Sequence, residues 1–385
     1  MPAYGTYISN YIKSVVFSAR FSHIDKKIYT PGNDREHLVA TMEWLCTAQS
    51  VTESGGVSSH FDIRTQQWGK PYCETTGYII ETFLSYYHLS GDSMYLEKAI
   101  DMGNWEVSVQ CSDGAFGEFK NNGHVGKKIF NTGQVLIGLL SLYEETHDDR
   151  YLESAKKAAD WLVCYQEPNG SWSAYTTQGP KTYHTRVAWP LIKLYTVSHI
   201  ERYKQCALKN IAWVIEQQNE THWFDNTSLS KTNTPWTHLI AYTLSGLLEA
   251  YLLLGSKDTE LFKSFYHPSK KLLEVYLENK ASFLPCSFDN KWQSKDRYSC
   301  LTGDAQLAII WMQIYDITRE KEFFDGACIM IEQIKSTQNI HTSNMAIRGG
   351  VFGSFPLSGA YAPFMLINWG AKFFADALIM KTRHI

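Results

Sequence analysis

Carboxyl groups open two strongly apolar stretches of this sequence, and they are the first candidates for chemistry. Glu74 precedes the run TTGYII, and Asp304 precedes AQLAII. Hydrolysis of a glycosidic bond needs two carboxyl groups that flank the bond, one protonated and one ionised. The pattern therefore predicts Glu74 and Asp304 as a catalytic pair, with Asp62 as a third acidic candidate.

Two histidines occupy the same kind of position. His184 lies beside Tyr183 and Arg186, and His238 opens a further apolar run. Elimination or epimerisation at a uronic acid needs a base for the proton beside the carboxylate and a cation that stabilises the enolate. A second hypothesis is therefore a uronate-type lyase or sugar epimerase that uses Tyr183, His184 and Arg186. His184 and His238 are catalytic candidates under either hypothesis.

Other polar and aromatic residues near the same boundaries are candidates for substrate binding. Trp and Tyr combine a flat apolar face with a hydrogen-bonding group, which suits stacking on sugars. The predicted substrate-binding residues are Asp62, Arg64, Trp68, Tyr72, Asn131, Gln134, Tyr183, Arg186, Trp236, Gln306 and Tyr361. A third hypothesis is non-catalytic, in which a concave helical surface binds a glycan or a biosynthetic partner protein.

Two kinds of helical segment alternate along the chain and would position these residues. Amphipathic segments have one polar face and are predicted as outer helices over 34–50, 92–110, 150–166, 200–218, 258–279 and 319–338. Segments that are apolar on every side must be buried on every side. They are predicted as inner helices over 74–90, 131–146, 184–198, 237–254, 301–317 and 360–381.

The connections between these segments are unequal. Turns from an inner to an outer helix are short and polar, whereas the opposite connections run about 15–25 residues, a length that usually marks a functional loop. A Trp-x4-Gln pattern, as in Trp44…Gln49 and Trp161…Gln166, recurs at the ends of outer segments, as in a repeat architecture. We predict an all-α (α/α)6 toroid of six inner and six outer helices, with the long loops on one face. It would form a single domain over 1–385, with 1–33 as an N-terminal helix and strap.

Composition narrows the function further. The formal net charge of −3 provides no basic surface for nucleic acid. No run of about 18 apolar residues is present for a membrane span, and the N-terminus lacks the pattern of a signal peptide. The 8 cysteines stand singly, which indicates reduced thiols and a cytoplasmic location. We expect no metal and no cofactor, and the oligomeric state stays open.

The alternating helices and the Trp-x4-Gln pattern resemble the (α/α)6 toroids of six-hairpin glycosidases, polysaccharide lyases and sugar epimerases. More narrowly, the segments GGVSSHFDIRTQQWGKPYCETTGYII, YHTRVAWPL and INWGAKFFADAL are similar to a poorly characterised bacterial group associated with surface-polysaccharide gene clusters. The resemblance implies glycan chemistry. The preferred hypothesis is a carbohydrate-active enzyme, a glycoside hydrolase, that cleaves a glycosidic bond in a bacterial, acidic oligo- or polysaccharide.

Overall fold

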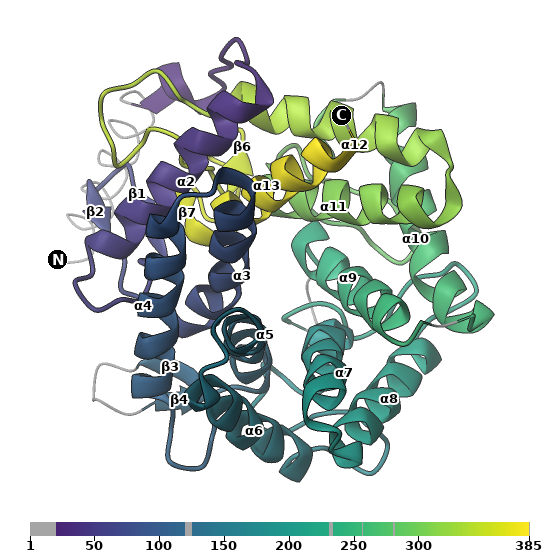
Figure 1. Cartoon of the computed structure of the whole chain (residues 1–385). Coiled ribbons are helices and arrows are strands. Elements are labelled where there is room, and N and C mark those ends of the chain that lie inside the picture. Colours follow the sequence, from purple (N-terminus) through teal and green to yellow (C-terminus); the bar gives the residue numbers. More distant parts are fainter. Residues whose placement is uncertain (1–20, 120–124, 231–233, 256, 280–281, 385) are drawn as a thin grey trace, which may run out of the picture.

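Twelve helices form two concentric rings in the computed structural model, which describes residues 21–119, 125–230, 234–255, 257–279 and 282–384. The outer helices are α2 (Asp34–Ser50), α4 (Ser93–Val109), α6 (Asp149–Cys164), α8 (Glu201–Glu216), α10 (Thr259–Glu278) and α12 (Lys321–Thr337). The inner helices are α3 (Cys73–Ser90), α5 (Ile129–Thr146), α7 (Thr185–Ser198), α9 (Thr237–Leu253), α11 (Leu301–Thr318) and α13 (Asn368–Lys381). Figure 1 shows the molecule along the axis of the ring, with the inner helices around its centre. The predicted (α/α)6 toroid is confirmed.

The inner helices are apolar on every side because they are enclosed on every side. In α5 every residue from Asn131 to Leu142 is buried, whereas the outer helix α6 exposes Glu153, Lys157 and Asp160. This difference in burial is the pattern that the sequence predicts for inner and outer helices. None of the described helices is long and apolar enough to cross a lipid bilayer.

The ring closes where its first and last helices meet. The last helix, α13, packs against α11 and α3 in the inner ring and against α2 outside it. Ion pairs reinforce this closure, because Asp34 at the start of α2 lies 2.8 Å from the ammonium of Lys335 and 2.8 Å from that of Lys381. Before α2, the backbone N–H of Ser358 donates to the carboxylate of Asp25 at 2.7 Å. The rest of the predicted N-terminal helix, residues 1–20, lies outside the described residues.

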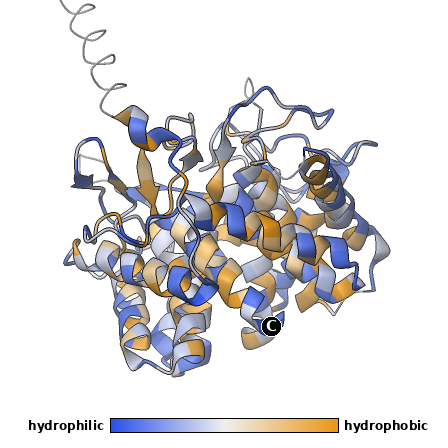
Figure 2. Ribbon diagram, turned by 90° about the horizontal axis from the view of Figure 1, so that it is seen from above, coloured by the Kyte–Doolittle hydropathy of each residue, from blue (hydrophilic) through white to orange (hydrophobic). Residues whose placement is uncertain are grey.

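The long connections carry three small antiparallel sheets. β1 (His60–Asp62) pairs with β2 (Gln67–Trp68) and with β7 (Met365–Ile367), so that Phe61 lies opposite both Trp68 and Leu366. The other two sheets pair β3 (Gly117–Phe119) with β4 (Val125–Lys127), and β5 (Ser299–Cys300) with β6 (Ser354–Phe355). Figure 2 shows these strands and long loops at one end of the ring, with the C-terminus at the other.

The sixth inner helix starts later than predicted. It begins at Asn368 rather than at position 360. Ala362 and Phe364 have φ values of 48° and 58°, which a right-handed helix cannot contain, and β7 pairs with β1 immediately before the helix. Tyr361 therefore lies in a loop and not in a helical first turn.

Candidate active site

The first turns of the inner helices and the long loops surround a cavity of about 310 Å³, called the front cavity below. Its walls come from α3, α5, α9 and α13 and from the segments before α5, α7 and α9. The predicted site residues that line it are Tyr72, Glu74, Asn131, Tyr183, His184, Trp236, His238 and Tyr361. Segments that are distant in sequence thus contribute to one basin.

Glu74 is the second residue of α3 and lies partly exposed in this wall. The hydroxyl of Tyr72 donates a hydrogen bond of 2.6 Å to its Oε2 atom. Burial raises the pKa of Glu74 to about 7, the bond from Tyr72 acts in the opposite direction, and the charge of Glu118 raises the pKa further. A large fraction of Glu74 is therefore protonated at neutral pH, as a general acid requires.

Both predicted histidines line the front cavity and are uncharged at neutral pH. Burial lowers the pKa of His184 to about 3 and that of His238 to about 4. The Nδ1 atom of His238 lies 2.9 Å from Oε1 of Gln306. With that oxygen as acceptor, the proton of the imidazole sits on Nδ1 and the lone pair of Nε2 is free. His238 is therefore positioned as a base or a hydrogen-bond acceptor.

Aromatic rings form much of the remaining wall. The ring centroid of Phe130 lies 5.2 Å from that of Tyr183 and 5.1 Å from that of Tyr242. On another side, the centroids of Trp236 and Tyr361 lie 4.9 Å apart in an edge-to-face contact. Such surfaces offer apolar faces for sugar rings and keep hydroxyl groups available for hydrogen bonds.

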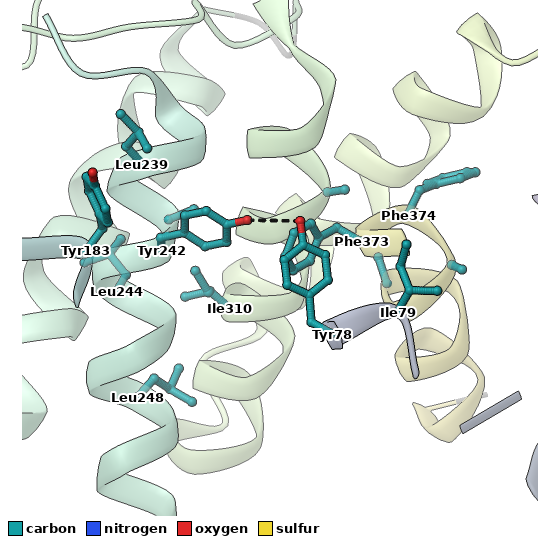
Figure 3. Packing of buried hydrophobic residues seen from close by; sticks show 14 of the residues in the cluster. Tyr78, Ile79, Tyr183, Leu239, Tyr242, Leu244, Leu248, Ile310, Phe373 and Phe374 are labelled. Atoms are coloured by element: carbon teal, nitrogen blue, oxygen red, sulfur yellow. Dashed lines mark hydrogen bonds between the residues drawn. The ribbon is translucent and has the colours of Figure 1, made fainter. Parts of the chain in front are cut away.

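A pair of tyrosines meets across the lumen, and one of them, Tyr242, lines the front cavity. The hydroxyl of Tyr242 donates to that of Tyr78 at 3.4 Å, from opposite sides of the lumen (Figure 3). The guanidinium of Arg186 lies 5.0 Å from the ring of Tyr242 and 5.9 Å from that of Tyr78. Beyond this pair is a second cavity of about 290 Å³, called the rear cavity below, whose lining includes Arg186 and Gln306.

Arg186, Gln134 and Gln306 are therefore not in the front cavity as predicted. The Nε atom of Arg186 donates to Oε1 of Gln134 at 2.9 Å, so Gln134 holds the arginine in place. The Oε1 atom of Gln306 lies within hydrogen-bonding distance of Nδ1 of His238. Arg186 is the second residue of α7 and follows His184 by two positions. At about 100° per residue, the two side chains therefore point in different directions.

Asp304 does not point into the mouth of the ring, so this prediction is wrong. The residue is only 1% exposed, and it is absent from the lining of the front cavity. The hydroxyl of Ser299 donates a short hydrogen bond to it, and burial raises its pKa to about 8. Gln306 faces the lumen, and two helical steps rotate a side chain by about 200°. Asp304 is thereby turned into the packing around α11.

Three further predicted residues lie outside both cavities, in the β1–β2 region. Arg64 forms an ion pair with Asp62 at 2.7 Å. Trp68 packs against Trp44 and Phe61, with ring centroids 5.4 Å and 5.1 Å away. These side chains contact one another, the β1–β2 sheet and α2. They therefore stabilise the loops rather than contact the front cavity.

The front cavity also contains residues that the sequence did not single out as site residues. They include Glu118, Lys128, Phe130, Tyr175, Thr177, Tyr242 and Trp369. Lys128 and Phe130 directly precede the predicted start of an inner helix at position 131, so their place in the sequence could have indicated them. Trp369 was not predicted as a site residue because the last helix was predicted to start at position 360, whereas it starts at Asn368 and Trp369 lies in its first turn. Glu118 and Tyr175 lie in long loops, where no periodicity indicates the direction of a side chain.

Among the described residues, no group of three or more His, Cys, Asp or Glu side chains is arranged to hold a metal ion. All eight cysteines are free.

Comparisons with known proteins bear on the fold. No protein-family model matches this sequence, and no curated protein matches it. The structure is similar to an unsaturated glucuronyl hydrolase specific for heparin, with a TM-score of 0.71 and 13% identity over 91% of this chain and 98% of that one. It is also similar to a cellobiose 2-epimerase from Bacillus thermoamylovorans B4167, with a TM-score of 0.72 and 14% identity over 91% and 98% of the chains.

A third similar structure is the unsaturated glucuronyl hydrolase responsible for degradation of glycosaminoglycan from Bacillus sp. GL1. Its TM-score is 0.71, with 14% identity over 92% of this chain and 98% of that one. The shared architecture runs over nearly the whole of each chain. It places this protein, by fold, among the six-hairpin (α/α)6 toroids, as the sequence resemblance implied.

Proposed function

We propose that this protein is a carbohydrate-active enzyme, a glycoside hydrolase, that cleaves a glycosidic bond in an acidic oligo- or polysaccharide. The observation that carries the proposal is Glu74 in the front cavity, hydrogen-bonded by Tyr72 and with a pKa of about 7. A carboxylic acid with such a pKa can protonate a leaving glycosidic oxygen at neutral pH. Aromatic walls beside it provide surfaces on which a sugar ring can stack.

Glu118 is the proposed partner of Glu74 in place of Asp304. It is the second carboxyl in the described lining of the front cavity, and it is exposed. Its negative charge helps to keep Glu74 protonated. One protonated and one ionised carboxyl group is the arrangement that glycoside hydrolysis needs. Asp304 cannot supply the second group, since its side chain is sealed in packing.

The charge distribution supports an acidic substrate. Lys128 lines the front cavity, and its positive charge acts on Glu74 there. The N-termini of α3, α5, α9 and α13 also border the cavity, and helix N-termini favour anionic groups. Two of the similar structures are glucuronyl hydrolases, which lends further support to a uronate-containing saccharide.

A second candidate function is proton abstraction in a uronate lyase or a sugar epimerase. The observation that favours it is the presence of two uncharged imidazoles, His184 and His238, in one cavity with Tyr183. A cellobiose 2-epimerase is among the similar structures. Here Lys128, rather than Arg186, would face the substrate carboxylate.

The test is incubation of the full-length protein with a panel of oligosaccharides that end in saturated or unsaturated uronate, followed by mass spectrometry. Hydrolysis adds one water per cleaved bond, elimination creates an ultraviolet-absorbing unsaturated uronate, and epimerisation incorporates deuterium from heavy water without shortening the chain. Saturable binding without any product would favour the non-catalytic hypothesis of a glycan-binding or partner protein.

The Glu74→Gln variant should lose about 10²- to 10⁴-fold in kcat, the usual contribution of general acid–base catalysis. Glu97→Gln, an exposed position on α4, is the matched control and should retain full turnover. Hydrolysis at the wild-type rate by Glu74→Gln would overturn the assignment.

We also propose that the protein resides in the cytoplasm. Eight free cysteines support this location, because cytosolic proteins keep their thiols reduced. Cell fractionation with a specific antibody tests it, and recovery in an extracellular fraction would contradict it.

A further inference from the structure

The rear cavity lies on the far side of the Tyr78–Tyr242 pair from Glu74, and its described lining shares no residue with the front cavity. Side chains from α3, α7, α9, α11 and α13 form it. At about 290 Å³ it is close to the lower end of the size range of small-molecule sites. None of the functions proposed above uses it.

A buried cation in its wall lacks a counter-ion. Arg186 is 4% exposed, and none of the described carboxylates forms an ion pair with it. Its Nε and Nη1 atoms donate to the neutral side chains of Gln134 and Ser245, at 2.9 Å and 3.4 Å, and its Nη2 atom has no partner. A buried charge without a partner is costly. Four aromatic rings, those of Tyr242, Trp189, Phe373 and Tyr78, lie 5.0, 5.1, 5.7 and 5.9 Å from the guanidinium and offset that cost only in part.

A second buried donor without a hydrogen-bond partner belongs to another residue of the same lining. Gln306 is 2% exposed, and its Nε2 group makes no hydrogen bond, while its Oε1 atom is taken by His238. Arg186 and Gln306 both line the rear cavity. Buried donors are paired in the great majority of proteins, so two of them at one cavity indicate a missing acceptor.

The other charged groups that face the cavity do not supply this acceptor. Asp376 is paired with Lys372 of the same helix, and Glu249 accepts a hydrogen bond of 2.7 Å from Gln313. Burial raises the pKa values of Glu249 and Asp376, and the charge of Arg186 acts on Glu249 in the opposite direction. Glu81 and Arg383 also line the cavity and carry opposite charges.

We propose that the rear cavity binds a small oxyanion, a carboxylate or phosphate group, against the guanidinium of Arg186 and the amide of Gln306. Guanidinium groups bind both kinds of anion through charge-assisted hydrogen bonds. Gln306 also contacts His238, so an anion bound here adjoins a residue of the front cavity. This inference does not depend on the proposed glycoside hydrolysis.

Isothermal titration calorimetry with the full-length protein tests it, with inorganic phosphate and sodium glucuronate as separate probes and sodium chloride as the ionic-strength control. One saturable site is expected for at least one of the two anions, and the preferred probe distinguishes phosphate from carboxylate. Arg186→Gln should weaken binding by at least about tenfold, the loss typical of one charge-assisted hydrogen bond. Arg319→Gln, at an exposed arginine after α11, should leave it unchanged.

Two steric variants locate the bound anion and remain informative if Arg186→Gln fails to fold. Ser245→Phe fills the rear cavity, and Thr177→Phe fills the front one. Binding should be lost in Ser245→Phe and kept in Thr177→Phe, with both folds checked by circular dichroism. Absence of binding in the wild type, or loss only in Thr177→Phe, would overturn the proposal.

Discussion

At the scale of single residues, the two carboxyl groups predicted as a catalytic pair have raised pKa values for one physical reason, but only one of them lines the front cavity. Burial acts on Glu74 and on Asp304 alike. Glu74 lines the front cavity, whereas Asp304 is enclosed by protein. A shifted pKa is therefore a pointer to function only when a substrate can also reach the group.

Tyr72 should tune the pH dependence of the proposed acid. Its hydrogen bond lowers the pKa of Glu74, since it stabilises the ionised carboxylate. In Tyr72→Phe the pKa of Glu74 should rise, so Glu74 stays protonated to higher pH. We expect the alkaline limb of kcat/KM to move up by about half to one pH unit, as for the loss of one hydrogen bond. A pH–rate profile of both enzymes measures it, and a downward shift would contradict Glu74 as the acid.

At the scale of elements, the sequence predicts which segments are inner helices more reliably than it predicts their rotation. An amphipathic helix reveals its buried side, but a helix that is apolar all round has no polar face to orient it. The starts of the inner helices were therefore predicted well, apart from the last one, while Asp304 and Arg186 were assigned to the wrong surface. Glu118 and Tyr175 depend on loop conformations that hydrophobic periodicity does not encode.

The rotation of α11 leads to a prediction for Asp304→Asn. The variant should retain turnover, because the side chain does not line the front cavity. In the folded protein this carboxyl keeps its proton up to a pH of about 8, whereas in the unfolded chain it ionises near pH 4. Stability is therefore lost as the pH rises through this window. The amide should increase the free energy of unfolding at pH 8.5 by on the order of 3 kcal/mol, and have little effect at pH 4.

Urea denaturation at the two pH values gives the stability change, and a turnover assay gives the activity. A loss of turnover as large as that of Glu74→Gln, in an Asp304→Asn variant that stays folded, would contradict the conclusion that Asp304 does not take part in catalysis.

At the scale of the whole molecule, the toroid depends on a joint between its two ends. Asp34 of α2 contacts Lys335 of α12 and Lys381 of α13. Burial of Asp34 opposes ionisation, but its bonds to the two lysines outweigh burial and lower its pKa. This stabilisation is therefore present above the unfolded pKa, near 4, and is lost as the pH falls through the folded pKa.

Asp34→Asn should lower the free energy of unfolding at pH 7 by about 1–3 kcal/mol, since it removes one of the two carboxylates, Asp34 and Glu332, that Lys335 and Lys381 share. The loss should shrink at pH 3. Asp325→Asn, which removes an exposed pair with Lys321, should cost less than about 1 kcal/mol. Chemical denaturation of the three proteins makes the comparison, and equal losses at pH 7 would show that the joint is no stronger than a surface pair.

The tyrosine pair across the lumen has a consequence for how a polymer could be handled. Tyr78 and Tyr242 meet across the lumen, and the described linings of the front and rear cavities share no residue, so the described residues show no passage from one cavity to the other. A saccharide strand could insert only its tip and would have to withdraw by the same route. An enzyme of this shape would trim terminal units, so the product released early from a long chain would be a single sugar while the chain itself stayed long.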